Sequence, residues 1–387
     1  MIVIRWRSFG LKEIHRGGSG KKMVDKEFWK GKKVFLTGHT GFKGTWLSLW
    51  LTSMGAHVTG YALAPPTSPS LFELTNLENI VDSYIGDIND YKELQRLVSS
   101  VDPDIVFHMA AQPIVGDSYK EPVATFQTNV IGTVNILEAV YHAVTEGSKV
   151  RAVVNVTTDK CYQNKNWYWG YRENEPLGGN DPYSASKACS ELVTNSYRKS
   201  FFSEGSKVAI ASARAGNVIG GGDWSPERLI PQCLKSLLNE EPIILRKPNA
   251  VRPWQHVLEP LSGYLLLAEK LHTEGQTYAQ AWNFGPDYND CKEVGVVVNR
   301  LIQLWGKKIP VKHLTENLYA ESDLLMLDCS KSKSLLSWKP IWTLEHSLYQ
   351  IVKWTKVYQH QGDVREVTLK QISEYMKEIQ KRQSLDE

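Results

Sequence analysis

The chain has 387 residues, of which 42% are hydrophobic and 22% are charged. These proportions are typical of a globular protein and exclude a fibrous or largely disordered chain. The formal net charge is +3 and the basic residues are scattered, which disfavours nucleic acid or a membrane surface as a partner.

Residues 1–22 are interpreted as an extension outside the fold. They contain Gly17-Gly-Ser-Gly20, which is typical of a flexible joint, and Met23 is a candidate second start. The extension lacks the apolar core of a signal peptide, and no apolar stretch of the chain approaches the roughly 20 residues of a membrane span. The five cysteines are widely spaced and form no C-x-x-C pair, which predicts a reducing, cytoplasmic setting without disulfides or a metal site.

From Lys33 onward, short β-branched runs alternate with longer amphipathic segments. The predicted buried strands are Val34 to Thr37, His57 to Leu63, Ser83 to Ile85, Asp104 to Met109, Ala152 to Thr157 and Val208 to Arg214. The predicted helices between them are Trp46 to Met54, Tyr91 to Val98, Pro122 to Val144 and Pro182 to Phe202. This alternation predicts an α/β fold of the Rossmann type, with a doubly wound parallel sheet, over residues 23–215.

The first predicted strand runs directly into Gly38-His-Thr-Gly41-Phe-Lys-Gly44 and then into an apolar helix. A strand, a glycine turn and a helix in that order can hold the diphosphate of a dinucleotide at the helix N-terminus. Gly38 would allow the tight turn, Gly41 the close approach of a phosphate, and Gly44 the packing of helix on strand. A glycine turn that serves packing alone is the alternative, but its place at the start of a βαβ series favours the cofactor.

The second predicted strand ends in Tyr61-Ala-Leu-Ala64, without the acidic residue that usually holds a ribose hydroxyl. The stretch that follows, Pro65-Pro-Thr-Ser-Pro69, offers no basic residue to a 2′-phosphate. We therefore expect NAD rather than NADP.

The fifth predicted strand leads into Thr158-Asp159-Lys160, and Tyr183 and Lys187 follow at the start of the next predicted helix. Two residues four apart share one helix face, so the Lys187 ammonium can favour the phenolate and bring Tyr183 toward working pH as a base. An ordinary helix face and a solvated Asp-Lys pair are the alternatives. The position at the carboxyl end of a strand, where such sheets place their chemistry, favours an active site.

After about Gly216 the alternation loosens, and residues 216–387 are expected to form mainly a smaller substrate-binding region of mixed α/β structure, with some segments free to return to the first sheet. The predicted helices there are Pro226 to Leu238, Glu259 to Leu271, Lys292 to Leu304 and a charged helical tail, Leu369 to Lys381. Short strands are predicted at Ile243 to Leu245 and Ala281 to Phe284.

Several of these motifs together resemble one known family. The spacing of the glycine loop, Asp87-Ile88, His108-Met-Ala-Ala-Gln112, Asn129, Thr158 and Tyr183-x-x-x-Lys187 resembles the extended short-chain dehydrogenase/reductase group, over nearly the whole chain beyond Lys30. Within that group, the glycine loop, Thr158-Asp-Lys160, Trp167-Tyr-Trp-Gly-Tyr-Arg172 and Arg252-Pro-Trp-Gln-His256 resemble the nucleotide-sugar 4,6-dehydratases, in particular those of CDP-hexoses.

The resemblance implies NAD as cofactor, a CDP-hexose as substrate and a product for deoxysugar biosynthesis of the lipopolysaccharide type. The implied cofactor-binding residues are Gly38, Gly41, Phe42, Lys43, Gly44, Asp87, Ile88, Ala110, Gln112, Asn129, Thr157, Tyr183 and Lys187. For Asp87 a turn-forming role is the alternative. A homodimer is also implied, in which the predicted helices 122–144 and 182–202 of two subunits form a four-helix contact.

The implied reaction begins with oxidation at C4, in which Tyr183 takes the hydroxyl proton and Thr158 hydrogen-bonds the developing carbonyl oxygen. Asp159 would protonate the departing C6 hydroxyl. Lys160 would either remove the C5 proton or stabilise an enolate as a cation, and both roles stay open because the commoner hexose dehydratases carry Glu at this position. A 4-epimerase and a cofactor-sensing binding protein are the alternative functions, and the Asp159-Lys160 pair disfavours the epimerase.

A sugar nucleotide also needs groups that hold its diphosphate. Arg228 and Arg252 are the candidates, with Asn217 as a donor and Asn283 as a weaker candidate that would otherwise shape a turn. Four aromatic residues, Trp167, Tyr168, Trp169 and Tyr171, would either pack on the protein or contact the ligand. The stretch 220–224 is interpreted first as a mobile loop and second as a ligand cover.

Overall fold

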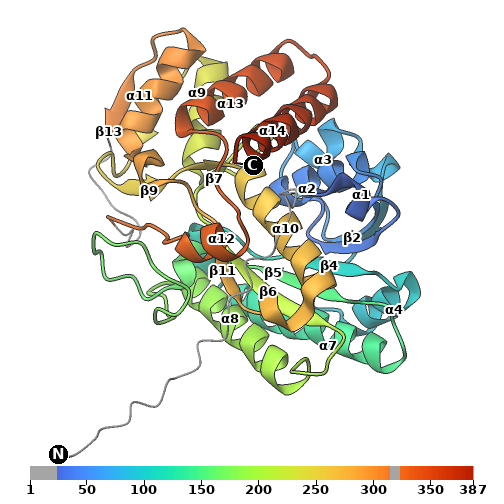
Figure 1. The fold of residues 1–387 in the computed structure, drawn as a ribbon. Coiled ribbons are helices and arrows are strands. Elements are labelled where there is room, and N and C mark those ends of the chain that lie inside the picture. Colours follow the sequence, from blue (N-terminus) through green and yellow to red (C-terminus); the bar gives the residue numbers. More distant parts are fainter. Residues whose placement is uncertain (1–23, 314–322, 387) are drawn as a thin grey trace, which may run out of the picture.

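The computed structural model describes residues 24–313 and 323–386 (Figure 1), so the predicted extension 1–22 lies outside the described residues. A sheet of seven parallel strands forms its centre, in the order β11-β6-β5-β4-β1-β2-β3. These strands are β1 Lys33–Thr37, β2 His57–Ala62, β3 Asp82–Ile85, β4 Ile105–His108, β5 Ala152–Val156, β6 Ala209–Arg214 and β11 Ala281–Asn283. The predicted Rossmann-type α/β fold is confirmed.

Alternate residues of the central strands face two separate cores. Val34 and Leu36 pack under α2, α10 and α14, whereas Phe35 packs under α4 and α7 on the opposite face. The helices of the first layer are α2 Phe42–Ser53, α10 Leu258–Glu274 and α14 Val364–Asp386; those of the second are α4 Tyr91–Val101, α7 Gly132–Thr145 and α8 Pro182–Ser200. Both faces of β1, β2, β4, β5 and β6 are therefore buried, which explains their nearly continuous apolar runs, whereas β3 at the edge of the sheet is largely exposed.

The six strands predicted within residues 23–215 lie within two residues of the observed ones. The seventh strand, β11, comes from the second half of the chain and pairs with β6. In addition, α10 packs on β5 and β6 and α14 packs on α2. The second half of the chain therefore supplies part of the sheet and much of one covering layer.

The remaining C-terminal elements form a smaller lobe with its own core, in the upper left of Figure 1. Its helices are α9 Leu229–Asn239, α11 Val294–Trp305 and α13 Leu344–Gln359, of which α13 was not predicted. Three two-stranded sheets accompany them: β7 Val218–Ile219 with β10 Gln255–His256, β9 Val251–Pro253 with β12 Cys291–Glu293, and β8 Ile243–Leu245 with β13 Val311–His313. The short helices α1 Lys26–Trp29, α3 Leu71–Leu74, α5 Val115–Lys120 and α12 Ser330–Leu335 lie between the larger elements.

The predicted helix 122–144 is divided by one irregular turn. It consists of α6 Pro122–Phe126, a π-helical turn Gln127–Ile131 and α7. A π-helical turn adds one residue to the helix and is frequent at functional sites. Asn129, a predicted cofactor residue, lies in this turn.

The stretch Gly220-Gly-Gly-Asp-Trp224 is not a free loop, so the predicted mobile loop is wrong. The Trp46 indole donates a hydrogen bond of 3.0 Å to the Gly221 carbonyl. A Cβ atom on Gly221 would lie 2.2 Å from the Trp354 ring, so only glycine allows the chain to pass here. The glycines serve close packing between α2 and α13.

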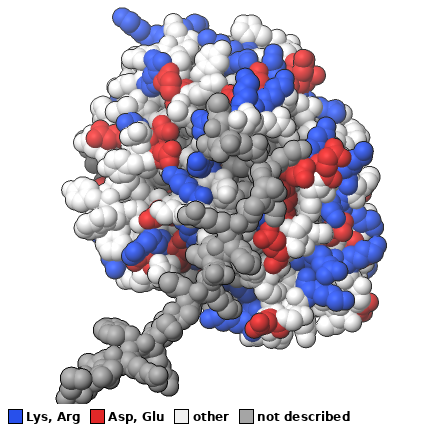
Figure 2. Space-filling model, in the orientation of Figure 1, with Lys and Arg blue, Asp and Glu red and all other residues white. Residues whose placement is uncertain are grey.

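The charged side chains form no single patch on the face shown in Figure 2, where Lys and Arg are interspersed with Asp and Glu. Among the helices of the described residues, none combines the length and apolar character that a membrane crossing requires.

Candidate active site

The glycine loop joins β1 to α2 in the way that its sequence predicts. Gly38 has φ +82°, and a Cβ atom there would lie 2.8 Å from the Ala110 backbone nitrogen. A Cβ atom on Gly44 would lie 2.1 Å from the Gly38 carbonyl oxygen. Gly41 is the N-cap of the twelve-residue helix α2 and has no such crowding, so its backbone stays open to an anion at the helix N-terminus.

The ends of β1 and β4 are tied together beside this loop. The Thr37 hydroxyl accepts hydrogen bonds of 3.1 Å from the N–H groups of both Met109 and Ala110. It also lies 2.8 Å from Nδ1 of His108, whose pKa burial lowers to about 3, so the ring is neutral. The strand order reverses between β1 and β4, and this is where open α/β sheets bind their ligands.

The side expected to receive adenosine is compact, and β2 ends there in the uncharged residues Tyr61 and Ala62. The Tyr61 hydroxyl donates to the Asp87 carbonyl at 2.9 Å. The Asp87 carboxylate accepts from the Asn89 backbone, which shows the turn-forming role that was the alternative for this residue. Ile88 is buried against Gly132. These residues fit a ribose without a 2′-phosphate, in agreement with NAD.

Gln112 and Asn129 connect the loop after β4 to helix α8. The Asn129 side chain accepts from the Gln112 N–H at 2.8 Å and donates to the Ser186 hydroxyl at 2.9 Å. Asn129 is almost fully buried, and the π-helical turn directs its amide toward α8. Its observed contacts position the neighbouring segments.

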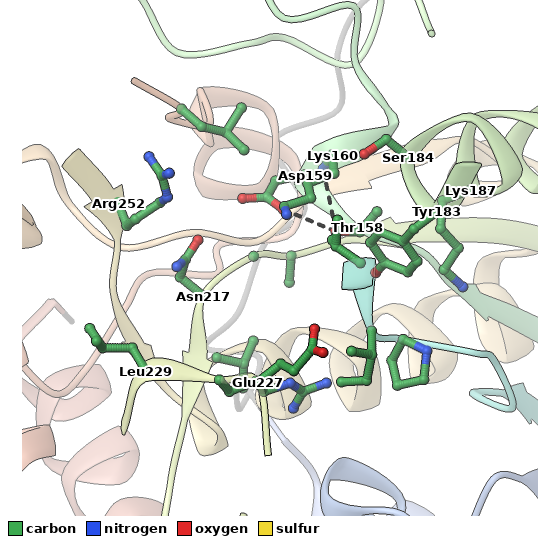
Figure 3. A pocket seen from close by; sticks show the side chains of 18 of the residues that line it. Thr158, Asp159, Lys160, Tyr183, Ser184, Lys187, Asn217, Glu227, Leu229 and Arg252 are labelled. Carbon is green, nitrogen blue, oxygen red and sulfur yellow. Dashed lines mark hydrogen bonds between the residues drawn. The ribbon is translucent and has the colours of Figure 1, made fainter. Parts of the chain in front are cut away.

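Thr158, Asp159 and Lys160 follow β5 in one 3-10 turn (Figure 3). The Thr158 hydroxyl donates to Oδ1 of Asp159 at 3.0 Å. Oδ2 of Asp159 is buried and has no hydrogen-bond partner among the described residues. A Cβ atom on Gly216 would lie 1.8 Å from this oxygen, so glycine leaves room for the carboxylate. Burial raises the pKa of Asp159, and the nearby Lys160 opposes the shift, which favours a proton donor.

Tyr183 and Lys187 lie on the face of α8 that meets this turn. Asp181 caps the helix by accepting from the Ser184 N–H at 2.9 Å, and Figure 3 shows the Tyr183 ring beside Thr158. The Lys187 ammonium donates to the Val156 carbonyl at 3.2 Å. Burial lowers the pKa of Lys187 to about 8. The structure thus brings all five predicted catalytic residues to one place.

The pKa of Tyr183 differs from the expectation. Burial raises it to about 12, although a hydrogen bond with Thr158 and the nearby Arg228 act in the opposite direction. The burial of both groups opposes the predicted activation of the phenol by Lys187, because a low dielectric disfavours the phenolate. The activation itself stays a prediction.

The pocket in front of these residues has a volume of about 510 Å³ and separates the sheet from the smaller lobe. Asn217, Arg228 and Arg252 line its opposite wall, as predicted for substrate-binding residues. Figure 3 shows Asn217 and Arg252 facing Asp159 across the cavity. Asn217 has φ +47°, a left-handed conformation that asparagine adopts more readily than most non-glycine residues.

The two arginines have different surroundings. Arg228 donates to the buried Asp223 carboxylate at 3.1 Å, so the loop 220–224 positions it. Arg252 donates to the Val251 carbonyl at 2.9 Å and lowers the pKa of Asp159 from across the cavity. Both guanidinium groups suit an anionic ligand such as a diphosphate.

Glu227 is a pocket residue that the sequence interpretation missed. Its carboxylate points into the cavity (Figure 3), 3.6 Å from the Lys120 ammonium. A Cβ atom on Gly116 would lie 2.1 Å from it. The predicted helix began at Pro226 and so included Glu227, whereas α9 begins at Leu229 and leaves Glu227 on the pocket wall.

Lys43 of the glycine loop also reaches the pocket. Burial, together with Arg228 and Lys187, lowers the pKa of its ammonium to about 7. Its neighbours show that the cofactor loop and the substrate wall share one cavity.

The structure does not bring Asn283 to the pocket. Its amide oxygen accepts from the Tyr162 hydroxyl at 2.7 Å, and its nitrogen donates to the Tyr171 carbonyl at 2.8 Å. Asn283 is fully buried because it ends β11 inside the main sheet. Its prediction as a substrate residue is therefore replaced by a structural role.

The four aromatic residues of the loop after β5 divide into two pairs. Trp167 and Tyr171 stack with ring centroids 5.3 Å apart, which supports the packing interpretation for them. Tyr168 and Trp169 are 81% and 70% exposed and do not line the pocket. Within residues 24–313 and 323–386, no group of His, Cys, Asp or Glu is arranged to hold a metal ion.

Comparison with known proteins places this geometry in context. A family model described as GDP-mannose 4,6 dehydratase matches residues 35–351. A CDP-glucose 4,6-dehydratase of Salmonella typhimurium (strain LT2) is 52% identical over 358 residues, which cover 92% of this chain and 99% of the relative. A dTDP-glucose 4,6-dehydratase of Xanthomonas campestris pv. campestris is 28% identical over 336 residues, 82% of this chain and 92% of the relative.

The fold is also found in solved structures. A Streptomyces venezuelae dTDP-glucose 4,6-dehydratase with NAD and TYD bound aligns with a TM-score of 0.72 at 23% identity, covering 86% of this chain and 99% of that structure. A UDP-glucose 4-epimerase of Thermotoga maritima with UDP-glucose aligns with a TM-score of 0.71 at 22% identity, covering 84% and 99% of the two chains.

Proposed function

This chain belongs to the GDP-mannose 4,6-dehydratase family, and we propose that it is an NAD-dependent CDP-glucose 4,6-dehydratase. One observation carries the dehydration in particular. Asp159 presents a buried carboxylate oxygen to which no residue of 24–313 or 323–386 donates a hydrogen bond, next to Thr158 and Tyr183. A 4-epimerase needs no such acid, because its C6 hydroxyl stays in place. The 52% identity to a CDP-glucose enzyme over nearly the full length of both chains supports the substrate.

The glycine loop and the end of β2 fit NAD. Gly38, Gly41 and Gly44 would hold its diphosphate at the N-terminus of α2, and Lys187 would hold ribose hydroxyls. Bound there, NAD would supply the hydride acceptor for oxidation at C4 and the hydride donor for reduction at C6, where a proton is also added back at C5. Tyr183 and Asp159 would transfer the protons of the two hydroxyl groups.

The first proton transfer belongs to Tyr183, which takes the proton of the C4 hydroxyl as the ketone forms. Thr158 stands beside the phenol and can donate to the developing carbonyl oxygen. The phenol requires a lower pKa than the value of about 12 that burial produces. Thr158 and Arg228 already act in that direction, and a bound cationic ring would add to it.

The second stage removes water from C5 and C6, since the C4 ketone makes the C5 proton acidic. Asp159 donates a proton to the departing hydroxyl, in keeping with its raised pKa. Lys160 lies in the same turn and acts as the C5 base or as the cation beside the enolate. Across the cavity, Arg228 and Arg252 hold the diphosphate and Asn217 donates to it.

The test is the product formed from CDP-glucose. Deuterium placed on C4 should appear on C6 of a 4-keto-6-deoxy sugar, which nuclear magnetic resonance detects directly. A C4-inverted hexose with an intact C6 hydroxyl would identify an epimerase instead. Parallel reactions with dTDP-, UDP- and GDP-hexoses should be slower, and a faster one would replace CDP-glucose as the substrate.

We also propose a cytoplasmic homodimer. The chain exposes apolar side chains on two neighbouring helical segments, residues 122–131 and α8. Val123 on α6 is 76% exposed, Ile131 on the π-helical turn 49% and Leu192 on α8 58%. Packing these faces of two copies together would form a four-helix contact. Leu192→Asp should produce a monomer in sedimentation analysis. All five cysteines are free thiols, which suits a reducing compartment.

A further inference from the structure

Three residues of α8, each four positions apart, meet the end of β5. Tyr183 lies beside Thr158, Lys187 donates to the Val156 carbonyl at 3.2 Å, and Glu191 accepts from the Thr157 hydroxyl at 2.5 Å. Residues with this spacing lie on one face of a helix. The helix face is thus attached to consecutive residues of the strand end that carries Thr158.

Glu191 is the centre of a buried hydrogen-bond network with Arg214. Both side chains are 3% exposed and lie 2.8 Å apart. One carboxylate oxygen accepts from Thr157 and from Nε of Arg214; the other accepts from the Ser212 hydroxyl at 2.6 Å and from Nη2 of Arg214. The remaining guanidinium nitrogen of Arg214 donates to the Tyr162 hydroxyl at 2.8 Å.

This network reaches both ends of the turn that carries the acid. Thr157 directly precedes Thr158-Asp159-Lys160, and Tyr162 follows the 3-10 turn at Cys161. The Tyr162 hydroxyl in turn donates a hydrogen bond of 2.7 Å to the side-chain oxygen of Asn283 in β11. The catalytic turn is therefore fixed to α8, β6 and β11 through Glu191, Arg214 and Asn283, which do not line the pocket.

We propose that Glu191 and Arg214 are positioning residues, which align the Thr158–Lys160 turn with Tyr183 and Lys187. The proposal rests on the dehydratase function. A buried ion pair is weak evidence for stability, because apolar residues of similar volume often replace such a pair without loss. A role in alignment gives this pair a function, since proton transfer needs donor and acceptor within hydrogen-bond reach.

The charge of Lys187 depends on several groups that face it. The Glu191 carboxylate on α8 favours the ammonium, whereas the Cys161 thiol on the 3-10 turn is neutral because burial raises its pKa. The Lys43 ammonium on α2 lies near Lys187 and opposes it, and His108 on β4 is neutral. Glu191 is the carboxylate of this set, so its loss should lower the pKa of Lys187.

A matched pair of variants separates alignment from stability. Thr157→Val and Ser212→Ala each remove one hydroxyl donor to the Glu191 carboxylate, but only Thr157 adjoins Thr158. With saturating NAD and CDP-glucose, Thr157→Val should lower kcat about tenfold, whereas Ser212→Ala should change it less than twofold, with similar losses of Tm for both. Equal kcat values for the two variants would overturn the proposal.

A double variant removes the ion pair altogether. Glu191→Met/Arg214→Met should keep a Tm near that of the parent, yet lower kcat about a hundredfold with little change in KM. The alkaline limb of its pH–activity profile should also shift to lower pH, because the pKa of Lys187 falls when the Glu191 carboxylate is removed. Glu345→Gln, which breaks the exposed Arg300–Glu345 pair, is the control and should leave rate and pH profile unchanged.

A folded double variant with the kcat and pH profile of the parent would reject the positioning role. Should the double variant fail to fold, the Thr157 and Ser212 pair decides the question alone. A parent enzyme that turns over while both hydroxyl variants behave alike rejects this inference only. A parent that leaves CDP-glucose unchanged rejects the proposed function and this inference together.

Discussion

The two walls of the pocket are built in different ways. On the catalytic wall, Asp159, Tyr183 and Lys187 are 2%, 9% and 5% exposed and are fastened to strands and to one helix. On the substrate wall, the side chains of Glu227 and Arg228 are 26% and 32% exposed and lie at the start of α9. Proton transfer requires fixed geometry and shifted pKa values, and burial provides both. Binding of an anionic ligand needs cations that water can reach before the ligand arrives.

Removing the catalytic base of the catalytic wall, Tyr183, should have the largest effect. Tyr183→Phe removes the proton acceptor for the C4 hydroxyl without changing the volume of the side chain. We expect kcat to fall about a thousandfold, on the order of 4 kcal/mol of transition-state stabilisation, while NAD still binds. Single-turnover reduction of NAD, followed by absorbance, measures this step. Turnover close to that of the parent would remove Tyr183 from its proposed role.

Lys160→Ala changes the same catalytic wall but should affect a later stage of the reaction, the removal of the C5 proton. We expect solvent deuterium exchange at C5 to fall about a hundredfold, while C4 oxidation falls much less, since Lys160 acts after the ketone has formed. Mass spectrometry of recovered substrate and product reports the exchange. Equal exchange in variant and parent would show that another group takes the C5 proton.

The substrate wall should respond in KM rather than in kcat. Arg252→Ala removes a charge-assisted contact to the diphosphate, so KM for CDP-glucose should rise about tenfold, with kcat within threefold of the parent. Arg300→Ala, at an exposed position outside the pocket lining, is the matched control. A larger loss in kcat than in KM would move Arg252 to the catalytic wall, and the comparison of the two walls would fail.

The dependence of kcat/KM on pH tests the burial of the catalytic wall through Lys187. The pKa of Lys187 is lowered by burial to about 8, so its ammonium form is complete well below that pH and is lost above it. We expect kcat/KM to decline several-fold between about pH 7 and pH 9 for this reason. In Lys187→Arg, whose guanidinium stays charged, the decline should disappear from whatever activity remains. A decline at the same pH in Lys187→Arg would assign it to another group.

The smallest effect is expected outside both walls. Trp169 is 70% exposed and does not line the pocket, so Trp169→Ala should change kcat, KM and Tm by no more than the experimental error. A clear rise in KM would show that the aromatic loop reaches the substrate. Trp167→Ala is the contrasting variant and should lower Tm, because its ring stacks on Tyr171.

Much of the catalytic wall could be predicted from the sequence, because each of its parts follows a local pattern. The glycine loop has a fixed spacing, and Tyr183 and Lys187 lie four apart at a helix start marked by Asp181. The parallel strands appear as continuous apolar runs because both of their faces are buried. The catalytic roles themselves stay predictions until the variants are measured.

The parts that could not be predicted depend on distant contacts or on helix ends. Glu227 was hidden by an error of three residues in the start of α9. Asn283 could not be identified as structural without β11, whose pairing with β6 brings together residues about 70 positions apart. The raised pKa of Tyr183 depends on how deeply the phenol is buried, which no sequence pattern measures.

The pairing of β11 with β6 limits how chimaeric enzymes can be assembled from this scaffold. A junction near residue 215 would exchange β11 together with the substrate lobe. The hydrogen bond between Tyr162 and Asn283 would then join residues from two different parent proteins. Donor sequences should therefore be joined after Asn283, or be grafted as short pieces such as 225–257. New sugar specificities would then be engineered by replacing segments of the substrate lobe while the seven-stranded sheet is left unchanged.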